Sequence, residues 1–413
     1  EGVVAGIGGI VIFIPQIAFL FFFIALLEES GYMSRVVFLM DRVMRPFGLS
    51  GKSVVPLMSG TACAIPAVMA TRNIESWKER LITILVTPFM TCSARLPVYL
   101  IIIALVIPEG RFIGLSYQAL TLMLLYLVGF LAAILSAMGL NRILKIPNRS
   151  FFVVEMPNYK WPLWKNVFYT VVEKTKSFVY GAGKIILAIS IVLWFLGSTG
   201  YSEEFRNAEE IVTERVQSQG FSEYSKAYMD QKMQEYRSTL RAGVTPADGR
   251  VPVGSVQDSI VKFRSLLEVR AVNQEIAGYK LEHSLIGRMG KFIEPAVEPL
   301  GYDWKIGIAV LTSFAAREVF VGTLATIYSV GSDEEETIKN RMAAEVKEDT
   351  GEPLFNLASG ISLLLFYAFA MQCMSTLAIV KRETNSWKWP ILQLVFMSAF
   401  AYIVAFAAYQ ILA

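Results

Sequence analysis

The sulfur-bearing side chains of this sequence have the types and spacing of a soft-metal site. The three cysteines, Cys63, Cys92 and Cys373, all stand within apolar stretches, and Met90 and Met371 each precede a cysteine by two residues. Thiolate and thioether sulfur favour transition metals over Mg²⁺ or Ca²⁺. An odd number of cysteines outside exterior loops does not fit a disulfide scaffold. The pattern therefore predicts a transition-metal site, and the alternative for each cysteine is a small apolar packing residue.

Charged side chains are nearly absent from the apolar stretches of the chain. These stretches contain four of them, namely Arg95, Lys184, Arg317 and Glu318. Because an ionisable side chain at membrane depth is by default functional or paired, we expect Glu318 to bind the metal or to pair with an arginine. Lys184 stands near the start of its stretch, where its side chain can extend to the membrane surface.

Three apolar stretches contain residues that interrupt a helix. Pro66 lies in the first, Pro88 and Pro97 lie in the second, and the third contains the adjacent Arg–Glu pair. Proline removes a helix hydrogen bond and clashes with the preceding turn. Broken helices at membrane depth line cavities or are buried in protein, and in transporters they mark the substrate site. We therefore predict gating or structural roles for Arg95, Arg317 and the three prolines, with an ordinary helix kink as the alternative.

The composition indicates which elements must position these residues. Apolar residues make up 54% of the 413 residues, and 18% are charged, against about 25% in soluble proteins. Eight long apolar stretches hold about half of the chain: Val3–Leu27, Ser53–Thr71, Leu81–Ile107, Tyr117–Leu140, Ser177–Gly200, Ile306–Ser332, Pro353–Val380 and Trp389–Ala413. Such stretches indicate membrane spans and exclude soluble, disordered and singly anchored proteins. The spans should be helices, because backbone in lipid must satisfy its own hydrogen bonds.

An internal repeat divides the chain into two halves. Five residues have counterparts 253 positions later: Arg35, Asp41, Pro46, Gly48 and Lys52 match Arg288, Glu294, Pro299, Gly301 and Lys305. In addition, Gly6-x-Gly8 matches Gly181-x-Gly183, and Met90-x-Cys92 matches Met371-x-Cys373. The sequence thus predicts an all-α polytopic membrane protein, with about eight transmembrane or re-entrant helical segments in two homologous four-segment halves with broken gate helices. Both halves should point the same way, unless one broken segment is re-entrant.

The halves give the expected domain boundaries. These are a first repeat at 1–140, a cytoplasmic connecting loop at 141–176, the first span of the second repeat at 177–200, a hydrophilic helical insert at 201–280 and the remainder of the second repeat at 281–413. The connecting loop carries seven Lys or Arg against two Glu, so the positive-inside rule puts it in the cytoplasm. Four crossings on each side of it would place both termini inside as well.

Other functional classes have little support. The net charge of +3 gives no reason to expect a nucleic-acid partner. The segment GLSGKS at 48–53 resembles the end of a phosphate-binding loop, but Pro46 replaces its first glycine, so we expect no nucleotide site within this chain. A single histidine, His283, excludes a His-rich zinc site, and with no nucleophile–base arrangement an enzyme is the least favoured class. Because the first residue is Glu1 rather than Met, we expect a further segment to precede it.

Long segments of the sequence resemble the membrane domain of the bacterial ferrous-iron transport protein B family, FeoB. They are PQIAFLFFFIALLEESGYMSRVVFLMDRVMRPFGLSGKSVVPLMSGTACAIPAVMATR at 15–72, TPFMTCSARLPVY at 87–99 and EPAVEPLGYDWKIGIAVLTSFAAREVFVGTLATIY at 294–328. The similarity covers nearly all of the chain except the insert. It implies a multi-pass transporter of the bacterial inner membrane that takes up Fe²⁺ as its substrate.

The resemblance also assigns residues and partners. Cys63 in GTACAIP and Cys92 in FMTCSARLP match cysteines of the family's first gate, whereas Cys373 and Glu318 match positions of the second. The family's GTPase domain normally precedes the first span and is absent from this chain, and a small FeoA-type protein is a further expected partner besides the lipid bilayer. A homo-oligomer is left open. The sequence departs from the family in having Glu-Glu-Ser at 28–30, where a Glu-Asp pair is usual.

The leading hypothesis is therefore a ferrous-iron permease domain with a cysteine-lined gated path. Cys63, Cys92 and Cys373 would supply sulfur, together with Met90 and Met371. Two alternatives remain, namely a transporter of nucleosides or other organic solutes and a non-transporting membrane scaffold whose cysteines only pack. The first would favour polar amide and hydroxyl side chains at the helix breaks rather than three sulfur positions.

Overall fold

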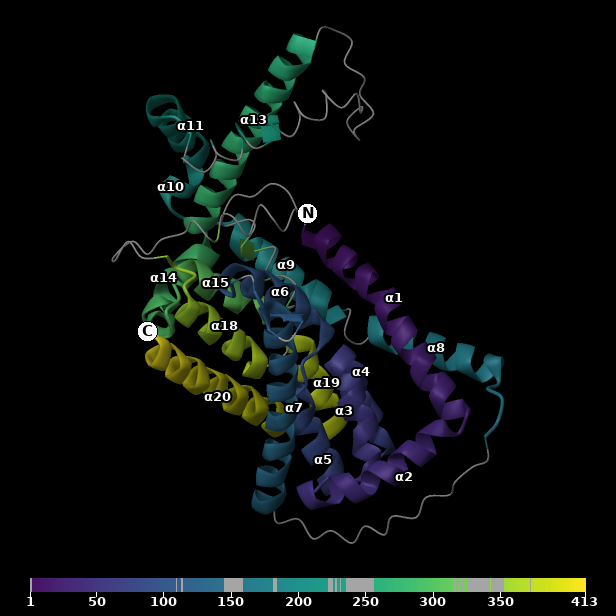
Figure 1. Ribbon diagram of the computed structural model, residues 1–413. Coiled ribbons are helices and arrows are strands. Elements are labelled where there is room, and N and C mark those ends of the chain that lie inside the picture. Colours follow the sequence, from purple (N-terminus) through teal and green to yellow (C-terminus); the bar gives the residue numbers. More distant parts are fainter. Residues whose placement is uncertain are drawn as a thin grey trace.

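The chain folds into a bundle of helices, several of which are broken near their middle (Figure 1). The computed structural model describes residues 2–108, 110–112, 114–144, 159–180, 184–221, 226, 229, 230, 232–234, 256–314, 317, 320, 323, 324, 342, 353–371 and 373–413. Apart from a short hairpin in which β1 (Arg111–Phe112) pairs with β2 (Leu115–Ser116), these residues form helices and their connections. The predicted all-α fold of a polytopic membrane protein is thereby confirmed.

The first half contains the helices α1 (Gly2–Glu29), α2 (Tyr32–Met44), α3 (Val54–Ala62), α4 (Ala64–Ala70), α5 (Trp77–Val86), α6 (Leu96–Val106) and α7 (Tyr117–Ile143). The second half contains α8 (Trp164–Phe178), α9 (Lys184–Ser198), α14 (Leu285–Val297), α15 (Trp304–Ser313), α18 (Leu357–Phe369), α19 (Met374–Thr384) and α20 (Lys388–Leu412). Four described segments are long and apolar enough to cross a membrane: Trp77–Val106, Tyr117–Ile143, Leu357–Thr384 and Lys388–Leu412. The two that are broken, α5–α6 and α18–α19, are the more buried and form the centre of the bundle.

The first broken segment, α3–α4, is a re-entrant hairpin. Its two short helices pack side by side (Figure 1) and meet at Cys63, whose backbone is extended. The two ends of the hairpin lie together, because Lys52 Nζ contacts Glu75 Oε1 at 2.8 Å. The hydroxyl of Thr83 in α5 also contacts that of Ser53 at 2.9 Å. A segment that returns to its own starting surface enters the membrane but does not cross it.

The two halves of the repeat contain equivalent hydrogen bonds at matching positions. The amide of Gly51 donates to Asp41 Oδ1 at 2.9 Å, and the amide of Trp304 donates to Glu294 Oε1 at 3.2 Å. Both donor and acceptor differ by 253 positions between the halves. In each half the carboxylate comes from an amphipathic helix, α2 or α14, and its acceptor oxygen fixes the backbone where the next broken segment begins.

The two halves point in opposite directions. Gly48 and Gly301, which both follow a 3₁₀ turn with positive φ, pack against Asn141 near the end of α7 and Tyr409 near the end of α20. Because α2 and α14 lie at opposite ends of the bundle (Figure 1), α7 and α20 run antiparallel. The broken segments are also antiparallel, since Arg80 at the start of α5 contacts Glu383 at the end of α19. The fold is therefore an inverted repeat, a common transporter architecture.

This arrangement changes the count of crossings behind the expected orientation. The count treated 53–71 as a crossing, but the structure folds this segment into a hairpin whose ends lie together. Of the described segments of the first half, α5–α6 and α7 are long and apolar enough to cross a membrane. The location of the N-terminus and the cytoplasmic location of the loop at 141–176 stay predictions.

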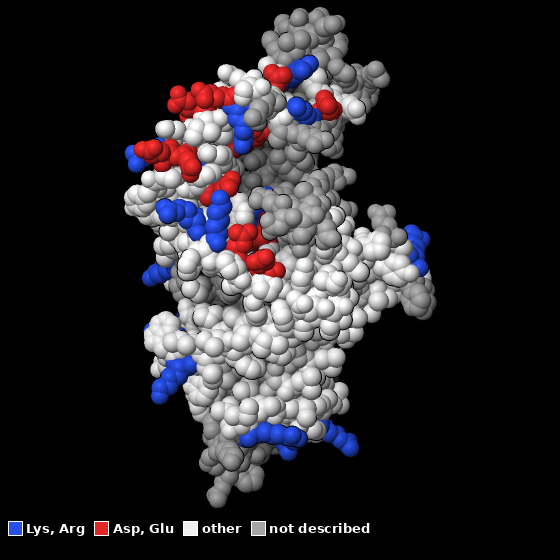
Figure 2. All heavy atoms as spheres, turned by 90° about the vertical axis from the view of Figure 1, so that its left-hand side faces the viewer, with Lys and Arg blue, Asp and Glu red and all other residues white. Residues whose placement is uncertain are grey.

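Two expected domains differ in detail. The range 141–176, expected as a loop, includes most of α8, which packs along α1, whereas residues 145–158 lie outside the described residues. The insert at 201–280 contains α10 (Glu203–Arg206), α11 (Ala208–Gln219) and most of α13 (Val256–Glu282), and residues 235–255 are not described. Figure 2 shows charged side chains gathered over this end of the molecule, above a broad area almost free of charge. Gly181 and Gly183 of the repeat also lie outside the described residues.

The repeated carboxylate gives a testable prediction for stability. Asp41 is buried, so Asp41→Ala should lower the free energy of unfolding by about 2 kcal/mol, because the Gly51 amide loses its acceptor. Glu294→Ala should cost about 1 kcal/mol, since its site is more exposed. Denaturation in detergent, followed by tryptophan fluorescence, measures both. The control Glu268→Ala removes only an exposed helix pair with Arg264 and should change stability by about 0.5 kcal/mol or less. Equal effects of all three variants would contradict the assigned role.

Candidate functional site

Each cysteine lies at a helix break, directly before a helical turn. Cys63 joins α3 to α4 with φ −157° and ψ 136°, and Cys373 directly precedes α19 with φ −75° and ψ 160°. Cys92 precedes the 3₁₀ turn η5 (Ser93–Arg95), with φ −85° and ψ 159°. Cys92 is buried, whereas Cys63 and Cys373 are partly exposed. The carbonyl of each cysteine accepts an amide of the following turn, from Ala67 at 3.4 Å, Arg95 at 3.0 Å and Thr376 at 2.9 Å. The oxygens that a break can present beside the sulfur therefore come from the end of the preceding helical segment.

The breaks of the first half touch each other. Ser93 Oγ, next to Cys92, donates to the carbonyl of Ala62, next to Cys63, at 2.9 Å. Gly60 in α3 faces Met90, and a Cβ at this position would lie 3.3 Å from Met90 Cβ. The second half repeats the contact, because the amide of Met374 donates to the carbonyl of Phe314 at 2.9 Å. In the first half the tip of the hairpin thus lies against the middle of the broken span, and in the second half the end of α15 makes the matching contact.

Arg95 joins the breaks of the two halves. Its guanidinium is fully buried, and Nη2 donates to the carbonyls of Pro88 at 3.3 Å and Ala370 at 3.2 Å. Nη1 donates to the carbonyl of Ala368 at 3.1 Å. Pro88 belongs to the 3₁₀ turn η4 (Thr87–Phe89) of the first break, and the two alanines belong to the end of α18. One side chain therefore satisfies backbone oxygens that both breaks expose.

Arg317, four residues after the end of α15, reaches the same place from the second half. Its Nη2 donates to the carbonyl of Ala370 at 2.8 Å and to that of Met371, and Nη1 donates to Tyr367 at 3.3 Å. Arg317 is 5% exposed, so two buried guanidinium groups share the Ala370 carbonyl. Their positive charge faces the C-terminal end of α18, which carries a partial negative charge. Among the described residues neither arginine has a carboxylate partner, and the Nε of each lacks a hydrogen-bond acceptor.

The structure brings some predicted site residues together and leaves others apart. Met90 and Met371 are both buried in the main apolar core, close to the arginines. Pro66 lies within α4, and Pro97 begins α6. Glu318 lies outside the described residues. Within the described part of the chain, no three His, Cys, Asp or Glu side chains are close enough to hold a metal ion. The metal roles of the predicted ligands therefore stay predictions.

One buried carboxylate was missed by the sequence-based reasoning. Glu383 in the last turn of α19 accepts from Arg72 Nε at 2.8 Å and from Arg80 Nη2 at 2.8 Å. Its side chain is 2% exposed. The contacts tie the open end of the first hairpin to the end of the second broken span. The only signal in the sequence is that Glu383 falls three residues after an apolar stretch, a position that ordinarily indicates a solvated carboxylate.

Comparisons with known proteins agree on a family. The Gate family, described as nucleoside recognition, matches residues 10–106 and 264–387, more than half of the chain. The C terminus of ferrous iron transport protein B matches residues 122–174. No solved structure matches the chain.

Curated relatives match the chain over its whole length. The Fe(2+) transporter FeoB of Leptospira interrogans serovar Lai is 39% identical over 412 residues, covering 100% of this chain and 50% of the relative. That of Leptospira biflexa is 40% identical over 416 residues, with the same coverage. A fusion of Fe(2+) transport protein A and FeoB from Porphyromonas gingivalis is 34% identical over 414 residues, covering 100% of this chain and 44% of the relative. The chain spans about half the length of these relatives.

The bridging arginine gives a second prediction. Arg95→Met keeps most of the side-chain volume but removes three donors, so we expect the free energy of unfolding to fall by about 3 kcal/mol, because buried carbonyls left without donors cost about 1–3 kcal/mol each. Arg95→Lys should restore little of this, since one ammonium group does not reproduce the planar fork of donors. Thermal unfolding in detergent measures both variants. The exposed Arg111→Met is the matched control, with an expected change of about 0.5 kcal/mol or less. A full rescue by lysine would show that charge alone suffices.

Proposed function

The chain belongs to the FeoB family as its membrane region, and on this premise we propose that it carries ferrous iron across the bacterial inner membrane. Fe²⁺ is the transported substrate and not a resident cofactor. The path runs through the helix breaks at the centre of the bundle. Inverted repeats with broken helices at mid-depth suit such a path, because each half can rock against the other around a shared site.

One observation carries this proposal. The three cysteines occupy equivalent places at the three described breaks, and Arg95 holds two of these breaks together. A borderline-soft cation such as Fe²⁺ suits a mixture of sulfur and oxygen ligands. Conduction requires ligands weak enough to release the ion again, and several partial sites meet that requirement better than one closed site.

We assign the ligands accordingly. Cys63, Cys92 and Cys373 bind the passing ion in turn, with Met90 and Met371 as thioether neighbours. Glu318 contributes a carboxylate. Pro66, Pro88 and Pro97 keep the breaks from closing into continuous helices, since proline cannot donate the missing hydrogen bond.

Arg95 and Arg317 act as the gate. In the structure their guanidinium groups donate hydrogen bonds to the carbonyl oxygens of Ala370 and Met371. Carbonyl oxygens of an unwound segment are also ligands for a cation. A metal ion can use these oxygens only after an arginine has withdrawn. The arrangement therefore corresponds to a resting state in which arginine guanidinium groups, rather than a metal ion, bind these carbonyl oxygens.

The remaining partners follow from the family. A GTPase domain of the full-length protein regulates or drives the gate, and an FeoA-type protein assists, as the fused relative from Porphyromonas gingivalis indicates. The chain itself performs no chemical conversion, binds no nucleotide and has no nucleic-acid partner. A homo-oligomer in the lipid bilayer is compatible with the exposed apolar faces of α7 and α20.

Ion uptake by the full-length protein in liposomes tests the proposal. Under reducing, anaerobic conditions with GTP, we expect Fe²⁺ uptake by the parent protein. We expect a loss of about tenfold or more in each of Cys63→Ser, Cys92→Ser and Cys373→Ser, because a hard hydroxyl replaces a soft ligand. Unchanged uptake in all three variants would contradict the sulfur path. Uptake of uridine instead of Fe²⁺ would support the organic-solute alternative.

The methionines provide a matched comparison. Met90→Leu and Met371→Leu conserve volume and should lower Fe²⁺ uptake severalfold without a large loss of stability, since such swaps usually cost below about 1.5 kcal/mol. Met123→Leu on the exposed face of α7 is the control and should leave uptake unchanged. An equal effect of all three would assign the methionines to packing alone.

A further inference from the structure

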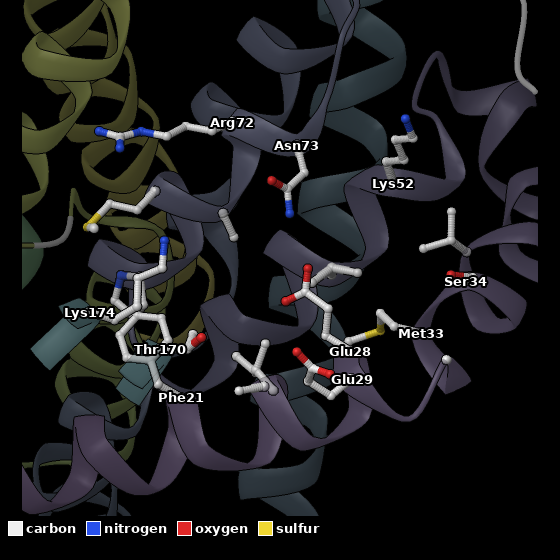
Figure 3. Close-up of a pocket in the computed structure, with 18 of the residues that line it drawn as sticks. Phe21, Glu28, Glu29, Met33, Ser34, Lys52, Arg72, Asn73, Thr170 and Lys174 are labelled. Atoms are coloured by element: carbon white, nitrogen blue, oxygen red, sulfur yellow. The ribbon is translucent and has the colours of Figure 1, made fainter. Parts of the chain in front are cut away.

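A large cavity lies beside the open end of the first hairpin. It has a volume of about 910 Å³ and is lined by α1, α2, α4, α8 and the segment that leads into α8. Its apolar wall includes Phe21, Val37 and Met69, and its polar lining includes Glu28 and Asn73. These two polar side chains extend toward each other into the cavity (Figure 3). A space of this size with a polar lining holds many water molecules.

The basic residues of the hairpin that line the cavity are bound elsewhere. Lys52 contacts Glu75 at 2.8 Å, and Arg72 contacts Glu383. Glu28, by contrast, has no ion pair within the described residues and is exposed to the cavity. Lys160 and Lys174 also line the space, so the lining offers charges of both signs to water and ions.

The cavity follows one face of α4 toward Cys63. Pro66, Ala70 and Asn73 all line it, and they stand three, seven and ten residues after Cys63. Residues at these spacings share a helix face. Pro66 is thus one turn from the cysteine at the hairpin tip. Cys63 is itself partly exposed and packs against an apolar cluster, two members of which, Phe21 and Met69, also line the cavity.

We infer that this cavity is a water-filled vestibule that connects Cys63 with the membrane surface that carries α2 and through which a hydrated divalent cation passes. The inference rests on the proposed function for the identity of the ion, but it makes a separate statement about access. Cys63 is accessible from the α2 surface, whereas we expect the buried Arg95 and Met90 to close the way to the α14 surface.

The test measures access to Cys63 in the full-length protein reconstituted in liposomes. A membrane-impermeant maleimide is added from either side, and mass spectrometry quantifies the labelled Cys63 peptide. Arg42→Cys on α2 and Arg288→Cys on α14 are exposed reference positions that define the two surfaces. We expect Cys63 to react at least about tenfold faster from the α2 surface, because thiol modification depends on exposure.

A plug in the vestibule sharpens the test. Ala70→Trp should slow the labelling of Cys63 at least about fivefold, because the indole fills the space along α4. If this variant fails to fold, Asn73→Trp at the exposed mouth serves the same purpose. Leu135→Trp on the exposed face of α7 is the control and should have no effect.

The outcomes separate this inference from the proposed function. One-sided labelling that the plug slows supports the vestibule, even if no Fe²⁺ is taken up. Equal labelling from both surfaces, faster labelling from the α14 surface, or an effect of Leu135→Trp equal to that of the plug would overturn it, even if uptake is normal. Ala70→Trp should also reduce Fe²⁺ uptake if both proposals hold.

Discussion

The centre of this protein depends on the capping of broken backbone by buried guanidinium groups. A helix that stops within a membrane leaves carbonyls without donors, and lipid supplies none. Arg95 supplies them to both broken spans, and Arg317 adds a second set at the end of α18. Without these donors, several buried carbonyls at the breaks would lack hydrogen bonds, at a cost in free energy, and continuous helices would be more stable. The hairpins, the crossing of the two spans and the positions of the cysteines all depend on breaks that remain stable.

The same interaction explains why the centre is stable but not permanently fixed. Two like charges that share the Ala370 carbonyl repel each other, while the end of α18 attracts both. Two opposing electrostatic terms therefore act at the same carbonyl. A modest change in the position of Arg317 would shift the distribution of hydrogen bonds between the two arginines. Such a balance suits an element that must alternate between two arrangements.

The sequence predicted the positions of the breaks better than the topology. Prolines and charges in apolar stretches located the breaks correctly at Cys63 and Cys92, and the 253-residue offset matched Asp41 with Glu294, whose equivalent hydrogen bonds only the structure shows. The re-entrant hairpin could not be read in the same way. Helices of 9 and 7 residues around a break have the same composition as one short span, and only the contact between Lys52 and Glu75 distinguishes them. Glu383 was missed because its burial comes from Arg72 and Arg80, which are distant in the sequence.

The inverted repeat has a consequence for how the chain is inserted into the membrane. The amphipathic helices α2 and α14 both carry basic residues, Arg35 and Arg42 in the first and Arg288 and Lys291 in the second. Because the two helices lie at opposite surfaces, their contributions to the positive-inside bias largely cancel. The halves alone therefore carry little information about which way the protein faces. That choice falls to the segments that are not duplicated.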